Sequence, residues 1–537
     1  MSFRKLALAV LVATASVHGG RVQDPFLTLP SDAATQRQAV KDIFTKSFTA
    51  YKEIAFPHDD LTPVSKSFTD GRNGWGASVV DAMSTMIIMG LDDLFTDAVD
   101  FASKIDFSVS HTTDSVSVFE TTIRYLGGLL SAFELSGEKY PVLVTKAKEV
   151  ADKMAFAFHT DLSPIPFGHI DFNTSIAEIA TSNIAEAGTL TLEWSRLTKH
   201  TGNDTYRALT ENSVRHIAGL PAPLPALAPQ GIDPSTGNFV GAFLSWGGGS
   251  DSYFEYLIKY ARITNTKDTL FADTWHTAVD SSIKNLARTS TVGNLQYLAD
   301  REDDGTIRHI GSHLQCFHAG NWLYGGRLLN NQSIIDFGLK LNEACWNTYA
   351  STATGIGPEA FGYFSSDGNF TGSNPSASDI AFYNQHGFFL LPGSTEYILR
   401  PEVLESNFYA WRVTGDKKFF DRAAAAVDSF NKFLPAPVAF AGINNVNNPN
   451  SGLIDDMESF WFAEVLKYLF LTFDDPNHIS LDEWVINTEA HPFKAPPTLP
   501  VYGSGKLIDQ VAPFKIKSGP LPAVSPIPRI NINGEVS

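Results

Sequence analysis

The segment SVFETTIRYLGG, residues 117–128, places a carboxylate and a guanidinium in a stretch that is otherwise largely apolar. Its apolar side chains recur at helical spacing, and Glu120 and Arg124, four residues apart, share a strip of the same helix. Gly127 and Gly128 follow, although glycine is costly inside a helix unless another segment must come close. Glu120 is therefore a candidate functional group.

Further carboxylates lie in apolar, aromatic helical segments along the chain. Burying a carboxylate without a partner is costly, so structure alone rarely demands many of them, although a helix cap or an ion pair explains any single one. Carboxylates gathered in one well suit glycoside hydrolysis, in which one acid protonates the leaving oxygen and another activates water, and they also suit Ca²⁺. These residues are Glu186, Glu193, Asp251, Glu255, Glu359, Glu402, Glu405, Glu458 and Glu464.

Aromatic residues could offer apolar faces to sugar rings, and Trp246, Phe361 and Phe460 are the candidates. Other chemistries find less support. The chain has no HExxH, and its 14 His residues show no zinc spacing. It also has no GxSxG elbow and no phosphate-binding glycine loop with a lysine. Hydrolysis by carboxylates is therefore the favoured chemistry.

The elements that must position these carboxylates are marked by small turns. The turns follow apolar helical stretches and recur mostly at a spacing of roughly sixty residues, which accommodates two helices with their loops. We therefore expect seven helix pairs, with short hairpins such as residues 239–246. The pattern alone leaves open whether the pairs form a solenoid or a closed ring. The turns are LDDL (91–94), LSGE (135–138), HTGN (200–203), TNTK (264–267), LNNQ (329–332), VTGD (413–416) and FDDP (473–476).

Composition bounds the class of protein. The 537 residues are 43% hydrophobic and 18% charged, which is typical of globular chains. The formal net charge of −18 makes nucleic acid and anionic membrane surfaces poor partners. Residues 1–20 begin with MSFRK and an apolar run, which predicts a secretory signal peptide, with a buried N-terminal helix as the alternative. No later segment has about eighteen uncharged apolar residues, so we expect no stable membrane anchor.

Cysteines and sequons agree with a secreted chain. The two Cys, Cys316 and Cys345, are expected to form one disulfide in an oxidising compartment, and a nucleophile with a spare thiol is the alternative. The sequons predict N-glycosylation at four residues, which are Asn173, Asn203, Asn331 and Asn369.

Six longer blocks of the chain are distinctive, and in order they read RNGWGASVVDAMSTMIIMGL, FETTIRYLGGLLSA, DSYFEYLIKY, LRPEVLESNFYAWRVTGD, ESFWFAEVLKYLFLTF and NTEAHPF. These blocks, in this order, resemble the class I α-1,2-mannosidases, glycoside hydrolase family 47. The resemblance implies an all-α fold, the (α/α)7 barrel of seven helix pairs with small β-hairpins, one of which closes the barrel near the C-terminus. It thus favours the ring over the solenoid.

The resemblance implies a mannosyl-oligosaccharide 1,2-α-mannosidase, which removes terminal α-1,2-linked mannose from high-mannose N-glycans with inversion and with Ca²⁺. Glu120 is expected to be the general acid, acting directly or through a water and held by Arg124, and a raised pKa would suit that role. Glu402 resembles the base that activates water. Asp251 resembles the third essential carboxylate, whose share of acid or base work stays open. Inversion needs about 6.5–9.5 Å between the acid and base carboxyls.

The same resemblance assigns the metal and the terminal sugar. Thr488 is expected to bind Ca²⁺ through its hydroxyl and its backbone oxygen. Phe460 is expected to stack under the sugar, near Arg400 and Glu464, with simple core packing as the alternative. The remaining Ca²⁺ ligands would be waters held by carboxylates, and those carboxylates are Glu186, Glu359, Glu405, Glu464 and Glu489.

Gly249 stands where the endoplasmic-reticulum type of the family has an arginine. This glycine resembles the Golgi and secreted types, which trim several mannoses, because a wider well admits more branches. Gly249→Arg is therefore expected to narrow trimming to fewer products. In the family, Cys316 and Cys345 likewise match the disulfide positions.

Two rivals remain beside the hydrolase. One is an inactive, lectin-like relative that binds mannose glycans in glycoprotein quality control, and the other is a barrel hydrolase of different sugar specificity. We expect a monomer of the secretory pathway, secreted or alternatively in the Golgi lumen or vacuole. Its catalytic domain would span residues 31–495. Residues 496–537 are Pro-rich and are expected to be extended or disordered.

Overall fold

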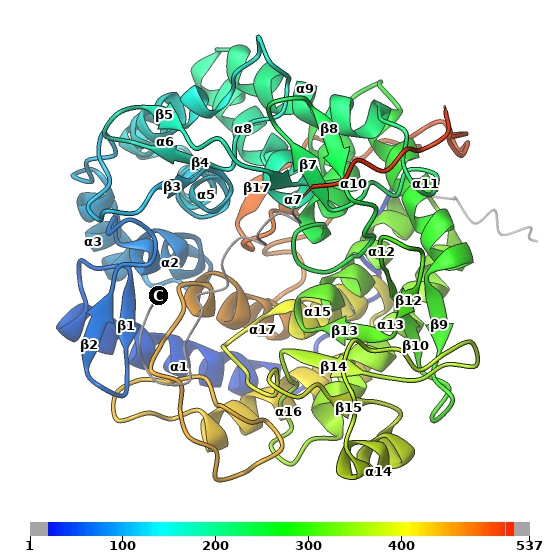
Figure 1. Cartoon of the computed structure of the whole chain (residues 1–537). Coiled ribbons are helices and arrows are strands. Elements are labelled where there is room, and N and C mark those ends of the chain that lie inside the picture. Colours follow the sequence, from blue (N-terminus) through cyan, green and yellow to red (C-terminus); the bar gives the residue numbers. More distant parts are fainter. Residues whose placement is uncertain (1–19, 511, 520–537) are drawn as a thin grey trace, which may run out of the picture.

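The computed structural model describes residues 20–510 and 512–519, so the predicted signal peptide lies outside the described residues apart from Gly20. In this part of the chain, long helices form two concentric rings (Figure 1). The inner ring comprises α2 (Ala77–Ile88), α5 (Gly127–Leu135), α8 (Thr191–Thr201), α10 (Asp251–Thr264), α12 (Phe317–Leu328), α15 (Glu402–Thr414) and α17 (Leu466–Phe473). The outer ring comprises α1 (Ala33–Ile54), α3 (Asp92–Ala102), α6 (Pro141–Met154), α9 (Thr205–Gly219), α11 (Leu270–Asn285), α13 (Gln332–Ala350) and α16 (Lys417–Phe433).

Each inner helix packs against one outer helix. The outer partner follows its inner helix in sequence, except that α17 packs against α1 from the other end of the chain. Neighbouring inner helices contact one another from α2 through α5, α8, α10, α12 and α15 to α17, and α17 returns to α2. This closure confirms the predicted (α/α)7 barrel and excludes the solenoid.

The two rings differ in how their helices are buried. In α15 every residue from Glu402 to Val413 is buried, whereas α16 buries only a stripe that includes Phe419, Ala423 and Val427. A helix that is apolar on one stripe belongs at a surface, and one that is buried all round belongs in the interior. The sequence therefore sorts the helices into rings before any pairing is considered.

The predicted turns connect an inner helix to its outer partner, or in the last case follow α17. Two of them end their helices with a left-handed glycine, Gly202 at φ 72° and Gly415 at φ 65°. A glycine there adopts positive φ without a side-chain clash and closes the helix end. Because these turns all follow inner helices, they lie at the same end of the barrel.

At the other end, loops and small antiparallel sheets surround the axis. The sheets are β1–β2 (Asp60–Thr62, Ser67–Thr69), β3–β4–β5 (Val116–Ser117, His169–Asp171, Ile176–Ala177), β6–β7–β8 (Ser182–Asn183, Gly231–Asp233, Asn238–Val240), β9–β10 (Ala287–Thr289, Gln296–Leu298), β11–β12 (Asp300–Arg301, Ile307–Arg308) and β13–β14–β15 (Ile310–Ser312, Ala360–Gly362, Phe389–Leu390). The short helices are α4 (Val118–Thr121), η1 (Thr122–Leu126), η2 (Ala155–Ala157), α7 (Ile184–Gly188), η3 (Leu314–Cys316), α14 (Ala377–His386) and η4 (Trp461–Val465).

A last hairpin, β16 (Trp484–Ile486) with β17 (Pro492–Lys494), enters the barrel along its axis (Figure 1). Ser131 Oγ of α5 donates a 2.7 Å hydrogen bond to Pro492 O, and Lys494 N donates one of 2.7 Å to Glu134 Oε2. The hairpin thus closes the barrel from the turn end, as predicted, and carries its tip toward the opposite end.

The disulfide predicted from the cysteine count is present. Cys316 and Cys345 join the start of α12 to α13, an inner helix to its outer partner. The bond therefore fastens one helix pair and leaves no free cysteine in the chain.

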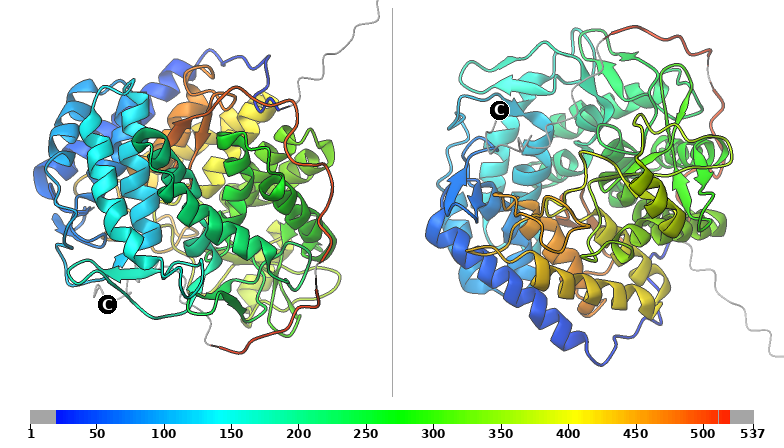
Figure 2. Two further views of the ribbon diagram at one scale, coloured as in Figure 1. Left: turned by 90° about the horizontal axis from the view of Figure 1, so that it is seen from above. Right: turned by 60° about the horizontal axis from the view of Figure 1, so that its bottom comes forward.

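Past the barrel, residues 496–510 and 512–519 contain no helix or strand and run along the outside of the barrel (Figure 2). Tyr502 is buried and its hydroxyl donates a 3.0 Å hydrogen bond to Asn265 Oδ1. Ser504 N donates one of 2.7 Å to Asp273 Oδ1, and Gly241 N donates one of 2.9 Å to Lys517 O. These contacts bind the segment to α11 and to the loop after β8.

Candidate active site

A cavity of about 130 Å³ lies on the barrel axis above the hairpin tip. It is small beside pockets for drug-sized ligands, which span about 300–1,000 Å³, so it suits one terminal unit of a larger ligand. Of the catalytic, sugar-binding and metal residues that the family resemblance implied, all except Glu359 line it. The predicted residues that line it are Glu120, Arg124, Glu186, Gly249, Asp251, Arg400, Glu402, Glu405, Phe460, Glu464, Thr488 and Glu489.

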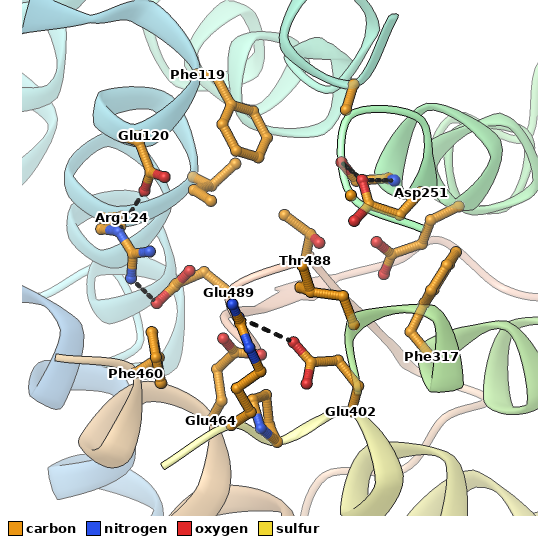
Figure 3. A pocket seen from close by; sticks show the side chains of 18 of the residues that line it. Phe119, Glu120, Arg124, Asp251, Phe317, Glu402, Phe460, Glu464, Thr488 and Glu489 are labelled. Atoms are coloured by element: carbon orange, nitrogen blue, oxygen red, sulfur yellow. Dashed lines mark hydrogen bonds and ion pairs between the residues drawn. The ribbon is translucent and has the colours of Figure 1, made fainter. Parts of the chain in front are cut away.

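Glu120 lies on one side of this cavity, at the start of the helix that follows β3 (Figure 3). Ser117 caps that helix by accepting a 3.2 Å hydrogen bond from Glu120 N. Arg124 Nε donates one of 2.7 Å to Glu120 Oε2, and its guanidinium also pairs with Glu489 and lies 3.4 Å from Asp81 Oδ2. Burial opposes the charge of Arg124, but these carboxylates raise its pKa well above the usual range. The arginine thus remains a cation, and its hydrogen bond holds the carboxyl group of Glu120 in place.

A π-helical turn, η1, presents Arg124 to the cavity. The two glycines after this turn allow neighbouring segments to come close. A Cβ on Gly127 would lie 2.8 Å from Asn487 Nδ2 of the hairpin, and one on Gly128 would lie 2.8 Å from Val80 O. The close approach expected from the glycine pair therefore exists. A second π-turn, η4, carries Glu464. Such turns widen a helix locally and occur frequently at functional sites.

Glu402 opens α15 and meets a histidine. His313 Nδ1 lies 2.6 Å from Glu402 Oε2, and His313 Nε2 lies 2.7 Å from the Tyr349 hydroxyl. Burial raises the pKa of Glu402, but the hydrogen bond and charge of His313, with Arg400, lower it below its usual value overall. The carboxylate is therefore ionised over a wide pH range, as a base for water requires.

Arg400 sits beside the carboxylate of Glu402 and is held by Glu359. Its Nε donates hydrogen bonds of 2.9 and 2.6 Å to the two oxygens of Glu359, and its Nη1 lies 3.8 Å from Glu402 Oε1. Glu359 itself does not line the cavity. Its position is that of an anchor for Arg400.

Asp251 faces Glu120 from the other side of the cavity in Figure 3. It is the first residue of α10, and Ser252 N donates a 2.9 Å hydrogen bond to its Oδ1. Burial, with Glu255 and Glu402 adding to it, raises the pKa of Asp251 to about 7. A carboxyl with that pKa can hold or release a proton near neutrality, which fits either acid or base work.

The floor of the cavity is the hairpin tip, where Thr488 and Glu489 lie (Figure 3). Asn487 beside them fixes the tip: its Nδ2 donates to Ile123 O at 3.1 Å and to Glu193 Oε1 at 2.8 Å. Burial and the charges of Glu489 and Glu402 raise the pKa of Glu464 well above its usual range. Residues 20–510 and 512–519 contain no group of three His, Cys, Asp or Glu that converges as direct metal ligands.

Gly249 belongs to a loop that forms part of the wall. Its φ of 84° is left-handed, and a Cβ there would lie 2.5 Å from Gln230 Nε2. That amide donates a 2.6 Å hydrogen bond to Gly248 O, and Ala185 N donates one of 3.1 Å to Gly249 O. Gln230 thus occupies the space that a side chain at position 249 would need.

Two aromatic predictions are wrong and one agrees with the geometry. Trp246 and Phe361 are 0% and 2% exposed, away from the cavity, because they pack in the core between helices and sheet. Phe460 lines the cavity, and the Arg124 guanidinium carbon lies 5.8 Å from its ring centre.

Sequence reasoning missed several residues at the cavity. Arg72 opens the block RNGWGAS, and His313 stands three residues before Cys316, so both lie in or near segments that the sequence had singled out for other reasons. Arg72 lines the cavity, whereas Asp81 and His313 lie directly behind lining residues.

The predicted glycosylation sites lie at the surface and do not line the cavity. Asn173, Asn203 and Asn369 are exposed, and half-buried Asn331 caps α13. Their glycosylation stays a prediction.

Comparison with known proteins gives one consistent answer. The model of Glycosyl hydrolase family 47 matches residues 43–495. A probable mannosyl-oligosaccharide alpha-1,2-mannosidase 1B of Aspergillus clavatus is 40% identical over 522 residues, covering 92% of this chain and 99% of the relative, and the Aspergillus phoenicis enzyme 1B is 39% identical, covering 93% and 99%. The solved alpha-1,2-mannosidase from Trichoderma reesei is 39% identical and superposes with a TM-score of 0.83, covering 86% of this chain and 99% of that one.

Proposed function

Since the chain belongs to glycosyl hydrolase family 47, we propose that it is a mannosyl-oligosaccharide α-1,2-mannosidase, which hydrolyses terminal α-1,2-linked mannose of high-mannose N-glycans with inversion. The observation that carries this proposal is that two carboxylates, Glu120 held by Arg124 and Glu402 held by His313, line one small cavity. Asp251 lines the same cavity, and its pKa of about 7 allows it to act as an acid or as a base. Two carboxylates in one pocket are the equipment of a glycosidase.

In the proposed reaction, Glu402 accepts a proton from water, which attacks the anomeric carbon. Its ionised state, maintained by His313 and Arg400, suits this step. A proton reaches the leaving oxygen from Glu120, directly or through a water, while Arg124 fixes the carboxyl of Glu120. Asp251, with a pKa of about 7, can exchange a proton with either partner. The Phe460 ring lines the place of the terminal sugar.

The proposal includes Ca²⁺ at Thr488. The donor set fits Ca²⁺. The hydroxyl and backbone oxygen of Thr488 lie among buried carboxylates, and the positive charge of Arg124 offsets the repulsion between these carboxylates only in part. Because no three carboxylates converge directly within the described residues, most ligands would be waters held by Glu186, Glu405, Glu464 and Glu489. When bound, the cation supplies positive charge and oxygen coordination to a sugar in the cavity. Glu359 instead holds Arg400.

The setting of the enzyme is also a proposal. Residues 31–495 are proposed to form the catalytic domain, and the Pro-rich residues 496–537 to be a tail outside it. We propose that the enzyme acts in the secretory pathway, with secretion favoured and the Golgi lumen or vacuole as alternatives. We also propose that it is a monomer and that it acts on glycoproteins. In residues 20–510 and 512–519, none of the helices combines the length and apolarity that crossing a bilayer requires.

The test is a proton NMR time course on α-1,2-mannobiose, first with Ca²⁺ and then with a chelator. We expect β-mannose to appear first and turnover to stop on chelation. A Glu120→Gln sample is the control for contaminating glycosidase. If neither mannobiose nor a high-mannose glycan is hydrolysed, while glycan binding persists, the lectin-like alternative replaces the hydrolase.

A further inference from the structure

A third arginine lies at the cavity beside Arg124 and Arg400. Arg72 comes from the loop between β2 and α2, far from the other two in sequence, and its side chain is only 12% exposed. Its Nε lies 3.6 Å from Glu120 Oε2, the same oxygen that receives the hydrogen bond of Arg124 Nε. Two guanidinium groups therefore address one oxygen of the proposed acid.

The loop that carries Arg72 is held mainly through its main chain, and the guanidinium adds one hydrogen bond, of 3.2 Å from Nη1 to the adjacent Gly71 O. Buried Asp59 accepts hydrogen bonds of 2.8–2.9 Å from the backbone N–H groups of Arg72, Gly74, Gly76 and Ala77. The Tyr125 hydroxyl donates one of 2.8 Å to Arg72 O. Removal of the guanidinium should consequently leave the loop in place.

The guanidinium itself bridges two acidic groups. Its Nη2 lies 3.8 Å from Glu458 Oε2, and its Nε lies 3.6 Å from Glu120 Oε2. Within the described residues, buried Arg72 Nε donates no hydrogen bond, and it meets Glu120 Oε2 only as an ion pair at 3.6 Å. Burying such a donor without an acceptor is costly, so a structural role alone does not account for it.

The charged surroundings agree with a cation that serves Glu120. Arg72 faces acidic groups from three elements and one further arginine, and Glu120 faces charged or titratable groups from the neighbouring sheet, helix and hairpin. The groups around Arg72 are Asp60, Glu120, Arg124 and Glu458, and those around Glu120 are Arg72, Arg124, His169, Glu186 and Glu489.

We propose that Arg72 is a positioning residue of the active site, which fixes the orientation of the Glu120 carboxyl together with Arg124. The inference rests on the proposed function, because Glu120 needs its orientation only if it delivers a proton. Two arginines on one carboxyl oxygen restrict its rotation more than one, and a small misplacement of a catalytic group can cost about 100-fold in rate. Arg72 needs no contact with substrate for this role.

The test compares Arg72→Met, Arg72→Lys and Arg72→Ala with the full-length wild-type chain on α-1,2-mannobiose. We expect kcat to fall roughly 10- to 100-fold in Arg72→Met while KM stays within about twofold, because orientation of the acid matters in the transition state and not in binding. Arg72→Lys should recover part of the loss. Added guanidinium at millimolar concentration should restore part of the activity of Arg72→Ala.

A matched control is Arg196→Met. Arg196 is also buried and donates a 2.7 Å hydrogen bond to Glu134 Oε1, outside the cavity. Its loss should lower the melting temperature, leave kcat near that of the wild type, and show no response to guanidinium.

Three outcomes contradict the inference. A kcat of Arg72→Met equal to that of the wild type would exclude a role in positioning. A raised KM at constant kcat would make Arg72 a substrate-binding residue instead. Inactivity of the wild type on mannobiose and on high-mannose glycans would overturn the proposed function and this inference with it.

Discussion

The proposed acid and base sides of the cavity hold their carboxylates through different neighbours. Glu120 is approached by two arginines, whereas Glu402 is hydrogen-bonded to a histidine and has one arginine, Arg400, at 3.8 Å. The two arginines restrict the orientation of the Glu120 carboxyl, and the hydrogen bond of His313 lowers the pKa of Glu402. The difference teaches that two buried carboxylates of one cavity can have separate neighbours, so that a substitution can change the orientation of one without changing the pKa of the other.

The largest effect is expected on the acid side. Glu120→Gln keeps the size of the side chain but removes the proton it carries, so kcat should fall about 10²- to 10⁴-fold. The increase of melting temperature with Ca²⁺ should persist, because Thr488 is unchanged. Steady-state kinetics and thermal melts check both; turnover near the wild-type level would remove the acid assignment and with it the comparison.

Thr488, between the two sides, provides the second test. Thr488→Ala removes the proposed Ca²⁺ hydroxyl ligand, and we expect Ca²⁺ affinity to fall at least roughly 10-fold, in line with the loss of metal-site partners. Ca²⁺ would then raise the melting temperature less at the same concentration, since only binding to the folded state stabilises it. A wild-type response in calcium-dependent melts would show that the cation binds elsewhere.

The base side should respond through pH. His313→Gln removes the partner that lowers the pKa of Glu402, and burial then raises that pKa. Because a base must be ionised, the acidic limb of the kcat/KM profile should move to higher pH, and kcat/KM on that limb should fall about tenfold for each pH unit that the limb moves. Tyr349→Phe, which removes only the hydroxyl behind His313, should move the limb less. An unmoved limb in both variants would show that the two sides are not controlled differently.

The smallest effect concerns which products form. Gly249→Arg should shorten the ladder of trimmed products, but the left-handed φ and the 2.5 Å approach to Gln230 predict a loss of stability in the single variant. Gly249→Arg with Gln230→Ala should relieve the contact and retain the short ladder. Gln230→Ala alone is the control and should trim as the wild type does. Glycan profiling by mass spectrometry measures the ladder, and an unchanged ladder in the double variant would contradict the assignment.

The periodic features of the fold could be predicted without coordinates. The turns near Gly202 and Gly415 marked real ends of inner helices, because glycine there satisfies a backbone requirement that is local. The blocks that resemble the family pointed to Glu120, Glu402 and Asp251, which indeed line one cavity. Prediction of Trp246 and Phe361 as sugar platforms failed, because an aromatic residue gives the same local signal in a core as in a pocket.

The sequence by itself determined which helices are buried all round, where they end, and which residue types could carry out hydrolysis, because periodicity, caps and motifs act over a few residues. The tertiary structure decided what depends on segments far apart in the chain. It brought Arg72 to Glu120, His313 to Glu402 and the tip of the hairpin at Thr488 into the ring. Contacts of that kind arise only when the barrel closes, since each one joins loops whose separation in sequence carries no local signal.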